Sequence, residues 1–286
     1  MVDKWEIKTR TENKGEAILP DIAEAIAEKC KKDGIAREDM EGIGIGIPAP
    51  VNEDGVVKNT ANLGWGYKEV KHELEELTGF KVEVGNDANM AALGEMWLGA
   101  GRGHKNLVMV TLGTGVGGGV IVGGRPLVGT NGAGGEIGHI LANRQETDKC
   151  GCGKKGCLEQ YASATGIARL ARIRLAKNND MTLLRGQEIT AKAVFDALKE
   201  GDKVAEEIVE EFGAYLGYAL ADVAAVIDPS MFIIGGGVSK AGPVIIQYVK
   251  KYFLEKAFFA NEGTEFIIAV LGNDAGMCGA AKLILG

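Results

Sequence analysis

Three cysteines and one histidine form a pattern that is typical of a zinc site. The 286 residues include five cysteines and three histidines. The candidate ligands lie close together in the sequence: His139, Cys150, Cys152 and Cys157. Glycines between the thiols allow the backbone to turn so that the sulfur atoms converge. Four such ligands leave no position for water, so we predict a structural rather than a hydrolytic Zn²⁺. The alternative is a turn with free thiols beside a surface histidine.

Two carboxylates flank the predicted metal site. Glu136 lies just before His139, and Glu159 lies just after Cys157. A chain that folds around one ion brings both carboxylates toward the same place. We therefore expect the metal to shape a polar binding site rather than to react itself.

Asp87 is a candidate reactive carboxylate. It follows a strand predicted over 81–84 and begins a helix that reaches about Leu98, and the carboxyl ends of strands are where open α/β sheets bind ligands. Asn and Asp are also ordinary helix caps, which is the alternative explanation. The motif at 85–90 is echoed at 272–277, where Asp274 has a similar local setting. The local pattern alone does not choose between the two aspartates.

A glycine-rich turn supplies a candidate phosphate contact. A strand predicted over 106–112 enters the turn, and a second strand leaves it and continues through 122. The turn contributes Gly113, Thr114, Gly115, Gly117 and Gly118. Backbone N–H groups of such a turn can converge on one anion. A dinucleotide fingerprint would open a helix, whereas here a strand resumes, so we predict a phosphate loop between two strands. A plain glycine-rich hairpin is the alternative.

A second glycine-rich turn follows the strand predicted over 231–234. It consists of Gly235, Gly236 and Gly237, and a further helix is expected to begin just after it. Exposed backbone at a strand end beside a helix N-terminus is suited to an anion or a nucleotide. The alternative is a tight strand-to-helix connection without a ligand.

The elements that must position these groups alternate along the chain. Short apolar runs alternate with amphipathic helices, which predicts α/β layers with largely parallel strands. In the first third, strands are expected over 5–10 and 42–47, and helices over 20–32 and 68–77. Glycine at alternate positions of 42–47 indicates either a close approach to one strand face or loose packing against a helix. We expect two domains that share a cleft, with a boundary near 101–104.

Composition excludes several classes of function. The hydrophobic content of 46% is enough for a large core, and the net charge of −7 without a basic block argues against nucleic acid as a partner. No apolar run approaches the roughly 20 residues of a membrane span, and the N-terminus has no apolar signal segment, so we predict a cytoplasmic protein without a membrane partner. Cys30 and Cys278 lie in apolar helical patterns, where buried reduced thiols are expected.

Five motifs in one order resemble the ROK family of bacterial sugar kinases, and within it the zinc-containing glucokinases. They are G-N-D-A-N at 85–89, L-G-T-G-V-G-G-G at 112–119, E-I-G-H at 136–139, C-G-C-G-K-K-G-C-L-E at 150–159 and I-G-G-G-V-S at 234–239. The resemblance runs over nearly the whole chain. It implies an actin-like, hexokinase-like α/β fold of the ribonuclease H-like type, with two domains around an interdomain cleft. The smaller domain would comprise 1–105 plus 273–286, and the larger 106–272 with the zinc site.

The resemblance also implies an activity and its residues. The protein would be an ATP-dependent hexose kinase that phosphorylates the 6-hydroxyl of glucose, with ATP and Mg²⁺ beside the structural Zn²⁺. Asp87 would be the general base, and Asp274 would remain a helix cap. The sugar would contact Asn62, Asn86, Asp87, Glu136, His139 and Glu159, with His139 also on the metal. The turn at 113–118 would hold the phosphates, the turn at 235–237 would lie against the nucleoside, and the chain would form a homodimer or homotetramer.

The sequence departs from the family at its start. The family opens with a strand and a D-x-G-G-T-x-x-K phosphate loop, and nothing of this form precedes Trp5. The strand predicted over 5–10 resembles the family's third strand, so the first hairpin, with its phosphate donors and acidic Mg²⁺ partner, is missing from the pattern. Either the natural protein is longer, or this is a shortened chain with weak or lost kinase activity. The presence of every other site residue favours the first explanation.

Other functions are open at this point. The family also contains repressors, so a non-catalytic sugar-binding or sensor protein is the main alternative. Another hexose such as mannose, fructose, allose or N-acetylmannosamine could replace glucose, because loop geometry decides among them. A zinc-dependent dehydrogenase is disfavoured by the strand that follows the first glycine turn and by the closed zinc site.

Overall fold

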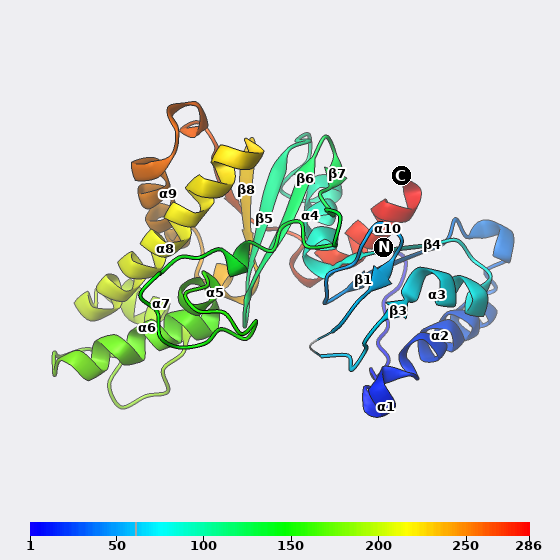
Figure 1. The fold of residues 1–286 in the computed structure, drawn as a ribbon, viewed down its shortest axis with the longest axis horizontal. Coiled ribbons are helices and arrows are strands. Elements are labelled where there is room, and N and C mark those ends of the chain that lie inside the picture. The colour runs from blue at the N-terminus through cyan, green and yellow to red at the C-terminus, as the bar shows by residue number, and fades with distance from the viewer. Residues whose placement is uncertain (61) are drawn as a thin grey trace.

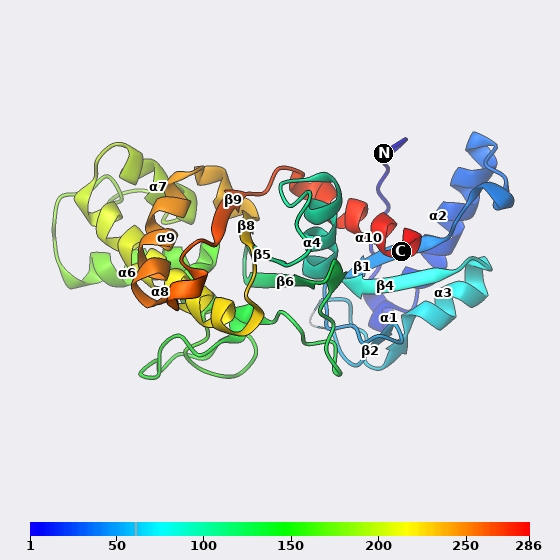
Figure 2. The ribbon, with the colours of Figure 1, turned by 90° about the horizontal axis from the view of Figure 1, so that it is seen from above.

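The elements of the protein form two lobes joined through a central helix. The computed structural model describes residues 1–60 and 62–286. In Figure 1 the smaller lobe, with α1–α3 and β1–β4, lies on the right, and α5–α9 form the outer part of the larger lobe on the left. Helix α4 and strands β5–β7 lie between these groups in both views (Figures 1 and 2). The α/β architecture predicted from the sequence is confirmed.

The smaller lobe is built on two parallel strands. β1 pairs with β4 in parallel, with Ile45 opposite Val84, and β2 pairs with β3 in an antiparallel ladder. Its elements are α1 (Glu12–Gly15), α2 (Ile18–Asp33), β1 (Ile43–Ile47), β2 (Val56–Val57), β3 (Lys68–Glu69), α3 (Val70–Thr78), β4 (Val82–Asn86), α4 (Asp87–Leu98) and α10 (Ala275–Leu285). The predicted helices over 20–32 and 68–77 and the strands over 42–47 and 81–84 are therefore confirmed, with shifts of a few residues at their ends.

The strand predicted over 5–10 is wrong. These residues have no regular secondary structure, and Trp5 and Ile7 are about half exposed, at 50% and 44%. The alternation of apolar and polar residues resembles a strand, but a strand also needs a neighbour that satisfies its N–H and C=O groups. Among the described residues, β1 pairs only with β4, and no ladder includes 5–10.

The larger lobe contains a five-stranded sheet with the order β7-β6-β5-β8-β9. β5, β8 and β9 are parallel, and β6 and β7 are antiparallel to their neighbours. The strands are β5 (Leu107–Leu112), β6 (Val116–Val122), β7 (Arg125–Pro126), β8 (Met231–Gly235) and β9 (Glu265–Ile268). The helices are α5 (Glu159–Ala162), α6 (Ala164–Lys177), α7 (Ala191–Lys199), α8 (Lys203–Ile227) and α9 (Val244–Lys256). None of the described helices combines the length and the apolar character that a membrane span requires.

Helices cover both faces of this sheet. Successive strand residues point to opposite faces. In β5, Val108 and Val110 belong to the core shared with α6–α9, whereas Leu107 and Met109 belong to the core shared with α4. The apolar run at 107–112 is therefore buried from both sides. Helix α4 thus packs on the large sheet, although it begins at the end of β4 in the smaller lobe.

Helix α4 also packs backbone to backbone against α10. A side chain on Gly279 of α10 would collide with the carbonyl oxygen of Met90 in α4, and one on Gly44 of β1 would collide with the carbonyl oxygen of Ala280. The bare face of the 42–47 strand is thus explained by the close approach of a helix. The three elements have no room for a Cβ atom at these contacts.

This packing generates a prediction for the two glycines of α10. We expect Gly279→Ala to lower the free energy of unfolding by about 1–3 kcal/mol or more, because the new methyl forces α4 and α10 apart. Gly276→Ala is the matched control, since a Cβ atom there meets no atom within 4 Å. It should leave stability unchanged or raise it by up to about 1 kcal/mol, because Ala favours a helix over Gly. Urea unfolding of both variants measures the difference, and equal effects would contradict the packing argument.

Candidate active site

A cavity of about 520 Å³ brings together most of the residues predicted to act on a ligand. Its wall is formed by residues 48–50 after β1, the β4–α4 junction, the β5–β6 hairpin, the segment before the cysteine loop, the start of α5 and the turn after β8. The predicted residues on it are Asn86, Asp87, Gly113, Gly115, Gly117, Gly118, Glu136, His139, Glu159 and Gly236. Residues that are up to 150 positions apart in the sequence therefore line one space.

Some predicted residues do not line this cavity. Asn62 is exposed and lies outside its wall. Thr114, Gly235 and Gly237 are next to lining residues without lining it themselves. Ala88 and Ala91 do line it and were not predicted. They lie one and four residues beyond Asp87. Residues three apart share one face of a helix, so the helix predicted to begin at Asp87 implies that these two alanines face the same space.

Asn86, and not Asp87, caps helix α4. The side-chain oxygen of Asn86 accepts hydrogen bonds from the N–H groups of Ala88 and Asn89, at 2.9 and 3.2 Å. Its amide nitrogen donates to the carbonyl oxygen of Ala49 at 3.2 Å. Because both polar atoms of Asn86 are engaged, this residue fixes the junction, and the helix begins with Asp87 directed to the cavity.

The carboxylate of Asp87 is partly free to react. One oxygen accepts a hydrogen bond from the N–H of Ala88 at 2.8 Å, and no described side chain forms an ion pair with it. The walls of the cleft partly remove water from the group, and this desolvation raises its pKa above the ordinary value of 3.8. Asp87 therefore has the features of an acceptor for a proton.

Asp274 lies in a different setting despite the echo in the sequence. It occupies the N-cap position of α10, as predicted, but its side chain caps no backbone N–H. Its carboxylate pairs with Lys4 at 2.6 Å on an exposed surface. Asp274 is thus a surface residue outside the cavity, which separates the two aspartates that the local pattern left equivalent.

The four predicted metal ligands converge. The donor atoms of His139, Cys150, Cys152 and Cys157 all lie within 4.8 Å of one another. The Cys152 and Cys157 sulfurs are 3.6 Å apart, and the Cys150 sulfur is 3.9 Å from Nδ1 of His139. A Zn–S bond of about 2.3 Å in tetrahedral geometry separates sulfurs by about 3.8 Å. The residues therefore fit a tetrahedral zinc ion.

The pKa values of the thiols are shifted in opposite directions. Burial raises the pKa of the Cys150 thiol to about 12, whereas the N–H of Lys154 lowers the pKa of Cys152. The Cys150 thiol donates to Oε1 of Glu159 at 3.4 Å. A metal ligand must be a thiolate, so zinc would displace this proton and leave Glu159 free of the thiol. The cluster and the cavity are therefore in direct contact through Glu159.

His139 connects the metal cluster to the cavity through its two ring nitrogens. Nδ1 faces Cys150, whereas Nε2 lies 4.0 Å from a carboxylate oxygen of Glu136 on the cavity side. A zinc ion on Nδ1 would fix the orientation and the tautomer of the ring. His139 can therefore bind a metal and a ligand of the cavity at the same time.

The loop that carries the cysteines is anchored by a buried carboxylate. The side chain of Glu146 is 6% exposed; it accepts a hydrogen bond from the Tyr161 hydroxyl and pairs with Arg169 at 2.8 Å. Burial alone would raise its pKa, but the hydrogen bonds from Tyr161 and the backbone of Asp148, together with Arg169, lower it to about 2. Glu146 thus remains ionised in any mildly acidic solution and holds the loop against α5 and α6.

Packing within the protein accounts for several glycines of the β5–β6 hairpin. A side chain on Gly118 would collide with the carbonyl oxygen of Gly135, and one on Gly119 with that of Ala88. By contrast, a Cβ atom on Gly113 meets no atom within 4 Å, and this residue lines the cavity. The predicted strand–turn–strand geometry is confirmed. Gly113 leaves space for a ligand, although its own N–H donates to the carbonyl oxygen of Gly115 at 3.0 Å.

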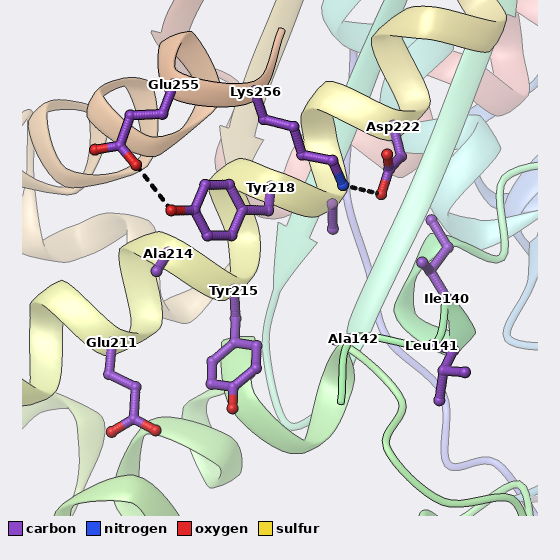
Figure 3. Close-up of a pocket in the computed structure, with 11 residues that line it drawn as sticks. Ile140, Leu141, Ala142, Glu211, Ala214, Tyr215, Tyr218, Asp222, Glu255 and Lys256 are labelled. Carbon is purple, nitrogen blue, oxygen red and sulfur yellow. Dashed lines mark hydrogen bonds and ion pairs between the residues drawn. The ribbon is translucent and has the colours of Figure 1, made fainter. Parts of the chain in front are cut away.

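A larger cavity of about 740 Å³ lies between α8, α9 and residues 140–142 and has no such convergence (Figure 3). Tyr218 donates to Glu255 at 2.8 Å, and Lys256 pairs with Asp222 at 2.6 Å. Figure 3 shows these two pairs bridging α8 and α9. Because four of its polar side chains are paired in this way, and it lacks the convergence of predicted residues, the cavity is a poorer candidate for chemistry than the cleft that contains Asp87.

Comparisons with known proteins show which family the chain resembles over its whole length. A family model described as the ROK family matches residues 1–286. A glucokinase from Halalkalibacterium halodurans is 43% identical over 290 residues, which cover 99% of this chain and 88% of that protein. A glucokinase from Thermotoga maritima is 38% identical and covers 96% of this chain and 87% of its own. The crystal structure of a ROK family glucokinase from Streptomyces griseus with glucose and AMPPNP has a TM-score of 0.77 at 35% identity, covering 98% and 90% of the two chains.

The convergence of the four ligands predicts the metal content. We expect the purified protein to carry about one Zn²⁺ per chain by mass spectrometry of its metals, and Cys157→Ser to lose most of it, because one of the four donors is weakened. Cys278→Ser is the control and should retain the metal, since Cys278 lies outside the cluster. Equal zinc in both variants, or no zinc in the unaltered protein, would contradict the site.

Proposed function

The chain belongs to the ROK family, and from this premise we propose that it is an ATP-dependent kinase that phosphorylates the 6-hydroxyl of glucose. Its glucokinase relatives support a sugar kinase. The observation that carries the proposal is the convergence of Asp87, Glu136, His139 and Gly113 on one cavity. Such a cavity offers a base, sugar-binding groups and a place for phosphate within one space.

Asp87 would act as the general base. The 6-hydroxyl of the sugar would donate its hydrogen bond to the free carboxylate oxygen. As the new O–P bond forms to the γ-phosphorus, the bond to the bridging oxygen breaks, ADP leaves, and the hydroxyl proton passes to Asp87. Proton transfer occurs late in such reactions, so the position of Asp87 matters as much as its basicity. That position is supplied by the Asn86 cap.

The sugar would be held by carboxylates and an imidazole that line the same cavity as Asp87. Glu136, His139 and Glu159 would accept hydrogen bonds from neighbouring hydroxyls. Asn86 would act chiefly as a positioning residue, because its polar atoms already have backbone partners. The predicted sugar contact of Asn62 lies outside the cavity wall and would require movement of its segment toward the ligand.

The phosphates would lie along the glycine turns. Gly113, Thr114, Gly115, Gly117 and Gly118 would face the transferring phosphates, and Gly235, Gly236 and Gly237 the nucleoside. Of these, Gly113 and Gly237 have the open space that a ligand needs. Mg²⁺ bound with ATP would neutralise charge on the phosphates. We also propose the domain division at 1–105 plus 273–286 and 106–272, a homodimer or homotetramer, and a cytoplasmic location.

A panel of hexoses tests the proposal. With ATP and Mg²⁺ we expect glucose to be phosphorylated with the highest kcat/KM among glucose, mannose, fructose, allose and N-acetylmannosamine. Asp87→Asn should lower kcat by about 10²–10⁴ and leave glucose binding by calorimetry within a few-fold, because it removes the base and keeps the shape. Asp274→Asn is the matched control and should behave as the unaltered protein.

Each outcome of this panel has a distinct meaning. Glucose binding without phosphorylation would favour a non-catalytic sugar-binding or sensor protein. A preference for another hexose would keep the kinase and correct the substrate. Failure to bind any of these sugars would overturn both readings.

The pKa of Asp87 predicts an acid limb in the activity profile. The base must be ionised, so kcat/KM should fall tenfold per pH unit as the pH drops through the pKa of Asp87 in the free enzyme. Because desolvation raises that pKa, the midpoint should lie above 3.8. Circular dichroism at each pH checks that the protein stays folded. A midpoint at or below 3.8 in a folded enzyme would contradict the raised pKa.

A further inference from the structure

The wall of the candidate active site holds few side-chain hydrogen-bond donors. The carboxylates of Asp87, Glu136 and Glu159 line the cavity, and none of its described lining residues is a lysine or an arginine. The hydroxyl group of Thr111 is the only hydroxyl among these lining side chains. Because an anionic ligand needs donors, each donor on the wall matters for the binding of phosphate.

Several donors near the first glycine turn already have partners. The N–H of Gly113 donates to the carbonyl oxygen of Gly115 at 3.0 Å, and the N–H of Val116 donates to Oε2 of Glu159 at 3.1 Å. The side-chain nitrogen of Asn86 donates to a backbone carbonyl oxygen after β1 at 3.2 Å. The turn therefore offers fewer free N–H groups to a phosphate than its glycine content predicts.

The hydroxyl group of Thr111 is free and accessible. It has no hydrogen-bond partner in the part of the chain that the structure describes. Its oxygen is not one of the unpartnered side-chain atoms that are shut off from solvent. Thr111 is half-buried and lines the cavity. The hydroxyl can therefore donate to a molecule in this space without the loss of a hydrogen bond inside the protein.

Thr111 lies in the sheet between the two glycine turns. In β5 it is opposite Gly117 on one side and Gly235 on the other. The alternation along β5 places its side chain on the face that packs against α4. A Cβ atom on Gly117 would lie 2.5 Å from Oγ1 of Thr111 and 3.4 Å from Cβ of Ala88. The hydroxyl therefore lies where both turns approach the first turn of α4, which begins with Asp87.

We propose that the hydroxyl of Thr111 donates a hydrogen bond to the phosphoryl group that is transferred to the sugar. This contact rests on the proposed kinase function and adds a side-chain donor to the glycine turns. Sugar hydroxyls find acceptors in the three carboxylates, whereas the non-bridging phosphoryl oxygens need donors. The transferred group passes from the glycine turns to the hydroxyl held by Asp87, and Thr111 lies at that boundary. A donor in this place stabilises the phosphoryl charge on a wall without cationic side chains.

Two variants of Thr111 test this contact. Thr111→Val removes the hydroxyl and keeps a β-branched side chain of similar shape, so β5 should stay intact. With ATP, Mg²⁺ and glucose we expect its kcat to fall about 10–100-fold, while glucose affinity by calorimetry stays unchanged. Thr111→Ser keeps the hydroxyl and is the matched control, which should retain most of kcat. Urea unfolding checks that both variants are folded.

Nucleotide binding supplies a readout that does not depend on turnover. With Mg²⁺ and glucose present, Thr111→Val should bind the ATP analogue AMPPNP about tenfold more weakly than the unaltered protein, because one hydrogen bond to a charged group is lost. It should bind ADP, which lacks the transferred group, as the unaltered protein does. Thr111→Ser should bind both nucleotides as the unaltered protein does.

The outcomes separate this contact from the proposed function. If the unaltered protein phosphorylates a hexose and Thr111→Val equals it in kcat and in AMPPNP affinity, the contact is wrong and the kinase function stands. Weaker glucose binding with unchanged AMPPNP binding would also overturn the contact, because it would place the hydroxyl on the sugar. If nucleotide binds without turnover, the comparison of AMPPNP with ADP still decides. If the unaltered protein binds neither nucleotide, the contact and the proposed function fail together.

Discussion

The close contact of helix α4 with its neighbours is the constraint on which the rest of the structure depends. At Gly279 and Gly44 the backbones of α4, α10 and β1 meet without intervening side chains. At the other end of α4, the fully buried carboxylate of Glu95 accepts hydrogen bonds from the N–H groups of Ala100, Val270 and Leu271, at 2.8, 3.0 and 2.8 Å. These three residues belong to the two chain segments that connect the smaller lobe with the larger one. Glu95 therefore ties both connections to the helix whose first residue is Asp87.

The metal cluster borders the same cavity. The loop that carries the cysteines has little regular structure of its own, so its shape depends on the ligand set and on the buried Glu146. His139 and Glu159 each touch both the cluster and the cavity. A zinc ion would thus act through geometry: it would orient His139 and release Glu159 from the Cys150 thiol. The chemistry itself would remain with Asp87, on the rigid side of the cleft.

The sequence predicts best where the determinant is local. The helix expected over 20–32 is found at Ile18–Asp33, and it ends where Gly34 adopts a left-handed conformation. The cysteine spacing predicted the cluster correctly because loop closure over a few residues leaves little freedom. Prediction failed where a distant partner decides. The 5–10 pattern needed a neighbouring strand, and none of the described strands pairs with it.

The charge of the candidate site favours a neutral ligand that is rich in hydroxyl groups. The carboxylates of Asp87, Glu136 and Glu159 all line the cavity. Burial first, and then repulsion from Asp87 and Glu159, raise the pKa of Glu136, while His139 opposes this effect. An anionic ligand among these carboxylates would add to the repulsion, whereas hydroxyl groups donate hydrogen bonds to them and relieve it. The first glycine turn lies next to these carboxylates, because the N–H of Val116 donates to Oε2 of Glu159 at 3.1 Å. The carboxylates therefore suit a polyol that lies next to the glycine turns proposed for phosphate, which is the proximity that transfer between them requires.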